Sequence, residues 1–448
     1  MGYHLQEVVC FLGLAVVFTC VSTAMAQYPA GLSSTGPKAA MDDQQSRARR
    51  ADPGSYTLKL GQVKFRVGLG VQQEYNDNVT LSKGAEQESD FITTPSVSLN
   101  TFWPFSKLNT LDFTLGLAYS KYWQHPELDT QSILISPNSM LDFNVYVGDI
   151  RINFYEKLSI QEDPIGQPQL SGASKFRRLE NTLGIKADWD LNRIVPGAGY
   201  QRYTFMALDK GSVTTDNGQT FAGLDHDTDS LFGQVGYKIN PKMLSGIRCD
   251  YSETTYKGTQ QNGSTSKAVA VFLDGELTHH ISAALSGGYQ MQEFATGGTI
   301  NDNSNFNSYI FQMSVKHELN RIFSHNLNLS RYAMAGIGTN SSEIQQVNYS
   351  FDWDLIKDVQ LRGSALFQMV KNSGSGSDSD SGSGLDSGSG SGPDSNSSNR
   401  YGLSISAYHK LFRSWDLGLG YDFLLKDSNI SENNYLQNRV YLNLTYNF

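Results

Sequence analysis

Apolar and polar residues alternate in successive segments from Val63 to the last residue of the sequence. The last segment shows the pattern most clearly. One set of its alternate residues is almost wholly apolar: Leu436, Asn438, Val440, Leu442, Leu444, Tyr446 and Phe448. A β-strand directs alternate side chains to opposite faces of its sheet. A sheet with one apolar face fits a soluble sandwich, with that face inward, or a transmembrane barrel, with that face toward lipid.

The lengths of the connections decide between these two classes. We count eighteen candidate strands, which begin near Val63, Asp90, Leu108, Gln131, Asp149, Phe176, Arg193, Asp227, Met243, Ser266, Ile281, Asn305, Phe323, Ile344, Lys357, Asn399, Trp415 and Tyr435. Eight short connections lie at 104–107, 147–149, 190–192, 240–242, 279–280, 319–321, 354–356 and 411–413. Nine longer ones alternate with them, at 82–89, 124–130, 164–175, 211–226, 259–265, 297–304, 339–343, 373–398 and 428–434. Outer-membrane barrels have tight periplasmic turns, longer external loops and an even number of strands. A soluble sandwich has no reason to sort its loops in this way.

The sequence therefore predicts an all-β protein, a transmembrane antiparallel up-and-down β-barrel of about eighteen strands, over residues 61–448. The N- and C-termini of the chain would both lie on the periplasmic side of the outer membrane of a Gram-negative-type bacterium. A count of sixteen stays open, because the segments at Arg193 and Phe323 alternate poorly. Pro95, Pro137 and Pro196 fall inside predicted strands, and because proline removes a ladder donor we expect them at bulges or rims.

Three segments fall outside the alternating pattern. Residues 1–26 contain an apolar run that ends at a small-residue site, Ala24-Met25-Ala26, which predicts a cleaved signal peptide. An uncleaved N-terminal anchor is the alternative, and the absence of Lys and Arg from the first seven residues departs from the usual signal. Residues 27–60 read as a flexible periplasmic segment. Residues 373–398 are a Ser/Gly/Asp repeat, which predicts a disordered extracellular loop.

No motif in the sequence indicates chemistry. Only Cys249 remains after signal cleavage, so neither an intrachain disulfide nor a thiolate cluster can form. No pair of histidines has metal-ligand spacing on a helix, and His279-His280 reads as an exposed turn pair. No Gly-x-Ser-x-Gly element occurs. We predict no catalytic residue, no metal and no cofactor. A net charge of -9 argues against a nucleic-acid partner.

The first hairpin resembles one protein family. It reads Tyr75, Asn76, Asp77, Asn78 and Val79, followed by Ser89, Asp90, Phe91, Ile92, Pro95, Val97 and Leu99. This resembles the opening element of the family named Putative beta-barrel porin 2. The resemblance implies an outer-membrane barrel, in some members linked to exopolysaccharide export, and it assigns no catalytic residue. The Ser/Gly/Asp loop is not part of the family pattern.

Alternation also predicts which charged side chains point into the barrel, where they would be hydrated or paired rather than exposed to lipid. The predicted lumen-lining residues are Lys64, Arg66, Asp112, Arg151, Glu180, Arg248, Asp250, Asp274, Glu276, Lys316, Glu318, Arg362, Lys410, Asp422 and Arg439. Both signs are present, so we expect weak ion selectivity. Asp250 follows Arg248 by two residues on the same face and is expected to pair with it.

These observations predict an outer-membrane channel for small hydrophilic solutes, with a link to exopolysaccharide export from the resemblance. The alternative is a non-conducting structural or adhesive barrel that acts through its external loops. A barrel enzyme with a site assembled from distant strands is the third hypothesis. Expected partners are outer-membrane lipid, the barrel-assembly machinery and a small hydrophilic solute or polysaccharide. Phe448 would be the assembly signal, and the oligomeric state is left open.

Overall fold

A computed structural model of the 448-residue chain describes residues 58–162, 176–208, 221–300, 302, 304–336, 339–373, 397–412, 414–429 and 433–448. The predicted signal peptide, most of the predicted periplasmic segment and nearly all of the Ser/Gly/Asp loop lie outside these residues. No helix in the described part of the chain is long and apolar enough to cross a membrane.

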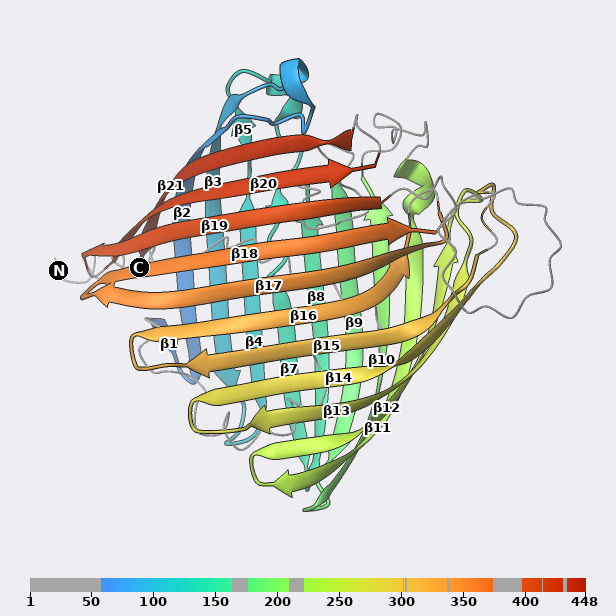
Figure 1. The fold of residues 1–448 in the computed structure, drawn as a ribbon. Coiled ribbons are helices and arrows are strands. Elements are labelled where there is room, and N and C mark those ends of the chain that lie inside the picture. The colour runs from blue at the N-terminus through green and yellow to red at the C-terminus, as the bar shows by residue number, and fades with distance from the viewer. Residues whose placement is uncertain are drawn as a thin grey trace, which may run out of the picture.

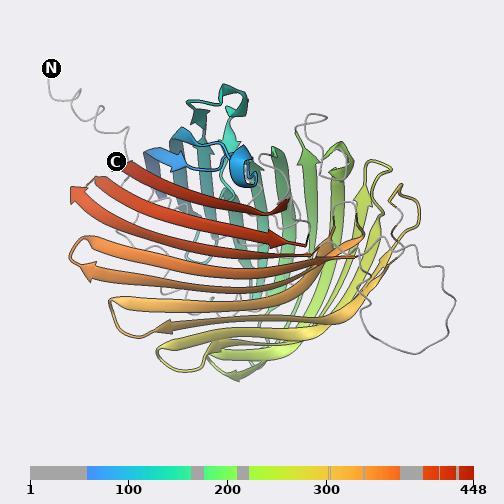
Figure 2. The same ribbon diagram turned by 45° about the horizontal axis from the view of Figure 1, so that its top comes forward.

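The described residues form one closed antiparallel sheet, the barrel in Figures 1 and 2. Its strands are β2 (Val63–Asn76), β3 (Asp90–Pro104), β4 (Thr110–Ala118) with β5 (Lys121–Tyr122), β6 (Leu134–Ile135) with β7 (Met140–Val147), β8 (Ile150–Gln161), β9 (Arg178–Trp189), β10 (Ile194–Ala207), β11 (His226–Asn240), β12 (Met243–Tyr256), β13 (Ser264–Glu276), β14 (Ile281–Phe294), β15 (Phe306–Glu318), β16 (Phe323–Ala335), β17 (Ser341–Ile356), β18 (Val359–Asn372), β19 (Ser397–Phe412), β20 (Trp415–Ser428) and β21 (Tyr435–Asn447). Counting β4/β5 and β6/β7 as one strand each gives eighteen, so the predicted fold is confirmed.

The ring closes where the last strand pairs with the first. β21 is antiparallel to β2 from Gly68, opposite Asn447, to Asn76, opposite Arg439. On its other edge β2 pairs with β3, so both edges of the first strand are occupied. Figure 1 shows β21 and β2 side by side, as the register requires.

A short additional strand extends this seam. β1 (Leu58–Leu60) folds back on β2 through a turn at Gly61, whose φ of 63° suits glycine. It pairs with Val63, Lys64 and Phe65, the part of β2 below the end of β21. The prediction of a flexible segment over residues 27–60 is therefore wrong for the last three residues, because they pair with the free edge of β2.

The connections are sorted by length as predicted. Those at one end of the barrel contain two to five residues, whereas those at the other end contain five to twenty-four. Figure 2 shows the tight turns of the strands from β13 to β18 gathered at one end. In the described parts of the longer connections there are three one-turn 3₁₀ elements: η2 (Gly84–Glu86), η3 (Pro126–Leu128) and η5 (Phe221–Leu224).

The fourth barrel strand is interrupted by a bulge that the sequence analysis did not predict. Ile135 lies opposite Leu117 and Met140 opposite Thr114, so two extra residues are inserted between β6 and β7. The hydroxyl of Ser139 fills part of the gap by accepting a hydrogen bond from the N–H of Gly116 (3.0 Å). The strand expected to begin at Gln131 therefore consists of two shorter pieces.

The three prolines take different positions. Pro137 lies in the bulge, and Pro196 is the third residue of β10, near a rim. Pro95 lies in the middle of β3, so its expected place at a bulge or rim is wrong. Its missing N–H faces the interruption between β4 and β5, where Tyr119 still donates to the Pro95 carbonyl (3.2 Å). The N–H group that Pro95 lacks would therefore face a point where the hydrogen-bond ladder is already interrupted.

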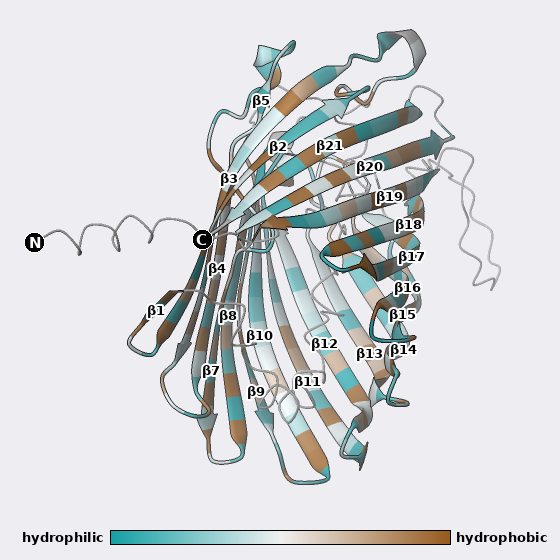
Figure 3. Ribbon diagram, turned by 90° about the vertical axis from the view of Figure 1, so that its left-hand side faces the viewer, coloured by the Kyte–Doolittle hydropathy of each residue, from teal (hydrophilic) through white to brown (hydrophobic). Residues whose placement is uncertain are grey.

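The two faces of the sheet differ in polarity. Along each strand in Figure 3 hydrophobic and hydrophilic residues alternate. The outward set is rich in exposed apolar side chains, such as Leu69, Val71, Val269, Val271 and Leu419. The inward set is mainly polar, with small apolar clusters rather than one hydrophobic core. This arrangement is the inverse of a soluble sandwich, as expected for a barrel in lipid.

Glycines on the inner wall make room for aromatic rings from the neighbouring strand. A Cβ on Gly246 of β12 would lie 2.5 Å from the Phe272 ring and 2.2 Å from the carbonyl oxygen of Val235. Gly184 makes room in the same way for Tyr155, and Gly420 for Tyr441. The rings lie against the wall because these neighbours have no side chain.

We predict that Gly246→Ala destabilises the barrel by roughly 1–3 kcal/mol, the usual cost of overpacking a tight site. Gly233→Ala on the adjacent strand is the matched control, because nothing lies within 4 Å of its added Cβ. The measurement is the temperature at which the folded band converts to the unfolded band in gel electrophoresis. Equal temperatures for the two variants would contradict the packing argument.

Candidate functional site: the inner face and the seam of the barrel

The structure places all fifteen predicted lining residues on the inward-facing set of their strands. We assign that set from the strand alternation and from the exposed apolar side chains of the opposite set. Lys64 and Arg66, for example, alternate along β2 with the outward Leu69 and Val71. That these residues line a water-filled pore stays a prediction.

The inward charges are paired locally. Three basic residues are followed two positions later by an acidic residue on the same strand, which forms a salt bridge: Arg178–Glu180 (2.6 Å), Arg248–Asp250 (2.7 Å) and Lys316–Glu318 (2.8 Å). Lys186 and Asp188 on β9 repeat the spacing, and both are buried. Residues two apart on a strand share a face, so each pair neutralises its own part of the wall.

Other pairs join neighbouring strands. Arg362 Nε lies 2.9 Å from Asp352 Oδ1, and Arg439 Nη2 lies 3.1 Å from Asp422 Oδ2. These pairs could not be predicted from the sequence alone, because they depend on the register that places β18 against β17 and β21 against β20.

Arg248 is the most enclosed of the predicted lining cations. Its guanidinium donates to both carboxylate oxygens of Asp250 (2.7–3.0 Å) and stacks 4.0 Å from the centroid of the Phe232 ring. The predicted pairing of Arg248 with Asp250 is confirmed. Because Arg248 is only 5% exposed, its charge depends on the Asp250 carboxylate for compensation.

A second polar network crosses β7 and β8 near the short-turn end. The Asp142 carboxylate accepts from the amides of Asn144 (2.6 Å) and Asn153 (2.5 Å), while Arg151 donates to Asn144 Oδ1 (2.8 Å and 3.0 Å). Asp142 lies directly opposite the predicted Asp112 of β4.

Sequence reasoning missed several inward charges. They include Asp142, Lys157, Arg178, Lys186, Asp188, Asp352 and Arg400. Asp142 was missed because the bulge at Pro137 hides the start of β7. Arg178, Lys186 and Asp188 share the parity of Glu180, so extending its alternation would have found them.

The loop end of the inner wall also has an apolar row. Tyr332, Ile344 and Val370 lie side by side on β16, β17 and β18 and are at most 3% exposed. Beside the row the bases of four loops are joined by buried hydrogen bonds that centre on one carboxylate. Asp302 Oδ2 accepts from the Asn340 N–H (2.7 Å) and the Ser373 hydroxyl (2.6 Å), and Asn262 donates to Asn340 Oδ1 (2.9 Å). The apolar row and the joined loop bases make this part of the rim a packed structure.

The family-like motif lies at the seam. Asp77 accepts from the backbone N–H (2.7 Å) and side-chain amide (2.6 Å) of Asn438 on β21. Asn78, which is fully buried, donates to the carbonyls of Leu436 (2.9 Å) and Ser82 (2.8 Å). The Asn78 carbonyl accepts from the amide of Gln437 (2.9 Å). These contacts continue the β2–β21 pairing beyond the end of β2.

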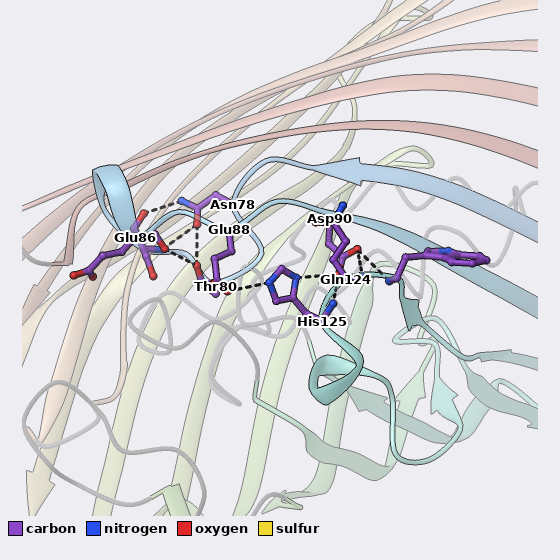
Figure 4. Close-up of polar contacts among 9 residues, drawn as sticks. Asn78, Thr80, Glu86, Glu88, Asp90, Gln124 and His125 are labelled. Carbon is purple, nitrogen blue, oxygen red and sulfur yellow. Dashed lines mark hydrogen bonds and ion pairs between the residues drawn. The ribbon is translucent and has the colours of Figure 1, made fainter.

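The second half of the motif holds the next loop. The buried Asp90 carboxylate accepts from the backbone N–H groups of Trp123, Gln124 and His125 (2.9–3.1 Å). In Figure 4 the His125 ring lies between Glu88 and Asp90. His125 Nε2 is 3.1 Å from the Glu88 carboxylate, and His125 Nδ1 is 3.1 Å from the Asp90 carboxylate. The motif thus joins the first two loops to each other and the first loop to the last strand. Its side chains serve the closure of the barrel.

No group of three or more His, Cys, Asp or Glu side chains in the described ranges is placed to hold a metal ion. Cys249 is exposed on the outward set of β12.

Comparison with known proteins agrees with this architecture. The family model described as Putative beta-barrel porin 2 matches residues 54–245, which confirms the resemblance in the first hairpin and extends it to β12. No curated protein matches the chain.

Three solved structures illustrate its structural neighbours. The first is OccK2 (OpdF) of Pseudomonas aeruginosa in complex with glucuronate, with a TM-score of 0.44 and 9% identity over 86% of this chain and 98% of that chain. The second is OccAB4 of Acinetobacter baumannii, with a TM-score of 0.44 and 10% identity over 89% of this chain and 100% of that chain. The third is a BenF-like porin from Pseudomonas fluorescens Pf-5, with a TM-score of 0.45 and 9% identity over 87% of this chain and 100% of that chain.

We predict that Asn78→Ala lowers barrel stability by about 1–3 kcal/mol, because the buried Asn78 amide no longer donates to the carbonyls of Leu436 and Ser82. Asn307→Ala is the control, since Asn307 is exposed near the loop end of β15. The conversion temperature of the folded band reports stability. An Asn78→Ala protein as heat-resistant as Asn307→Ala would show that these hydrogen bonds do not hold the seam.

Proposed function

We propose that this porin-like barrel is a channel of the bacterial outer membrane for small hydrophilic solutes. The observation that carries the proposal is the closed ring of eighteen strands with an apolar outer and a polar inner face. Barrels of sixteen to eighteen strands leave room for an aqueous channel. The short-turn end would face the periplasm and the long-loop end the exterior, with the end of β21 on the periplasmic side.

The inner wall favours neutral polar solutes over ions. Paired charges of both signs leave little net field along the wall, so neither cations nor anions are strongly preferred. Between the charges lie hydrogen-bonded amides such as Gln368 with Gln346 (2.9 Å) and Gln290 with Ser266 (3.0 Å). Amides and hydroxyls can exchange hydrogen bonds with the hydroxyl groups of sugars and polyols.

The finer proposal is export or passage of saccharide chains, which rests on the amide-rich wall and on the exopolysaccharide link implied by the family resemblance. Outer-membrane lipid and the barrel-assembly machinery are the proposed partners. Phe448, whose ring contacts Tyr446 (4.3 Å between centroids), is the proposed assembly signal. We propose no enzymatic activity.

A structural or adhesive barrel is the second candidate. The hydrogen bonds among Asn262, Asp302, Asn340 and Ser373 favour it, because they hold four loop bases in one fixed surface. Such a surface could present the loops to a partner without any conduction.

Planar-bilayer recording separates the two candidates. A channel gives stable conductance steps with a reversal potential near zero in a salt gradient, and liposomes containing it swell in neutral sugars. Folded protein that inserts but never conducts would overturn the channel proposal and leave the structural one.

The charge pairing makes a second prediction. Asp422→Asn leaves Arg439 without its carboxylate and should shift the permeability ratio toward anions, whereas Arg439→Gln should shift it toward cations. The shifts should grow as salt is lowered, because the screening length rises from about 10 Å at 0.1 M to about 30 Å at 0.01 M. Glu293→Gln, on the outward set of β14, is the control and should change neither ratio. If the permeability ratio shifted in the same direction in Asp422→Asn and Arg439→Gln, the proposal that these two charges compensate each other in the channel would be contradicted.

A further inference from the structure

Two histidines face each other across one hairpin on the outer surface. His317 near the end of β15 lies directly opposite His325 near the start of β16. His317 Nδ1 is 3.0 Å from His325 Nε2, and both side chains are half-buried. They lie at the short-turn end of the barrel, so their rings are close to water on that side.

Aromatic neighbours hold this pair in place. The rings of Phe323 and Tyr349 lie on two sides of His325, each with its centroid 5.8 Å away. Phe323 in turn packs on Phe351 (6.0 Å) and Trp353 (6.3 Å). A ring enclosed by such neighbours has few rotamers to lose when it binds a ligand, which lowers the entropic cost of binding.

We propose that His317 and His325 bind one divalent transition-metal ion, Cu²⁺ most tightly and Ni²⁺ or Zn²⁺ more weakly. Neutral imidazole is a preferred ligand of these ions, and affinity rises to a maximum at copper along the series. No third His, Cys, Asp or Glu joins the pair within the described residues, so water fills the other positions. Two protein ligands make a site of modest affinity.

The distance between the nitrogens selects among these ions. With metal–nitrogen bonds of about 2.0–2.1 Å, a tetrahedral ion separates two ligands by about 3.4 Å. The observed 3.0 Å corresponds to an angle close to 90° at the metal, the angle between adjacent ligands in the tetragonal sites of Cu²⁺ and Ni²⁺.

Two further histidines lie near this rim and must be tested separately. His279 and His280 form the turn before β14, and the His280 carbonyl accepts from the N–H of Glu318 (2.8 Å). Both are exposed, and Ile281, the residue that follows them, is paired with His317.

The test is calorimetric titration of folded, detergent-solubilised protein without a histidine tag, with CuCl₂ and then ZnCl₂. We expect one Cu²⁺ per chain, bound at least about tenfold more weakly by His317→Ala and by His325→Ala, since each loses half of the protein ligands. His409→Ala is the control, because His409 is exposed on the outward set of β19 at the same end. Electron paramagnetic resonance of bound Cu²⁺ should show two coupled nitrogens in the wild type.

A second measurement guards against misfolding of the variants. Cu²⁺ should raise the conversion temperature of the folded band in the wild type and in His409→Ala, but not in His325→Ala. Equal copper affinity in the wild type, His317→Ala and His325→Ala would overturn the proposal. Loss of binding only in a His279→Ala/His280→Ala variant would also overturn it and assign the ion to the turn.

Discussion

The pairing of β2 with β21 is the constraint on which the rest of the structure depends. In hydrocarbon an unpaired backbone N–H or C=O costs several kcal/mol, so an open sheet with two bare edges cannot exist there. The last strand covers only Gly68 to Asn76 of the first. Below it β1 pairs with Val63 to Phe65, and above it Asp77 and Asn78 bond to the start of β21. The seam is thus made by three elements: β21, β1 and the contacts of Asp77 and Asn78.

Much of the fold was predictable because two simple patterns survive in the sequence. Alternation with period two marks each strand, and the start predicted for β12, β14, β16, β20 and β21 is the observed residue. The sorting of loop lengths then gives the barrel its topology. The failures are local. Two extra residues near Pro137 split one strand, and an insertion this short does not look like a connection between two strands. The three residues of β1 are too few to show an alternating pattern.

The sequence predicted which charged side chains point into the barrel, but only some of the residues with which they pair. Arg248 and Asp250 share a strand, so their spacing alone predicts their contact. Arg439 and Asp422 come from different strands and meet only because the β20–β21 hairpin fixes their register. The pairing of the last strand with the first was predictable, but the side-chain contacts at the seam were not, since Asp77 and Asn438 are 361 residues apart. The contacts of this polar motif can be assigned only when the distant strand is in place.

The outward charges place the barrel in the membrane. In the described strands the outward-facing Asp, Glu, Lys and Arg residues all lie in the half nearer the long loops: Lys121, Glu156, Arg202, Asp227, Asp229, Glu253, Lys267, Glu293, Arg331, Glu343, Lys371 and Asp427. An outward Lys or Arg costs about 2–4 kcal/mol at the bilayer midplane and about 0–1 kcal/mol near an interface. The apolar band must therefore begin near the short turns, where Phe323, Trp353 and Trp415 form an aromatic rim at the interface with water. The strands extend beyond this band at the long-loop end, so the side-chain contacts of Asp77 and the buried Asn78, rather than lipid, must hold the ring closed there.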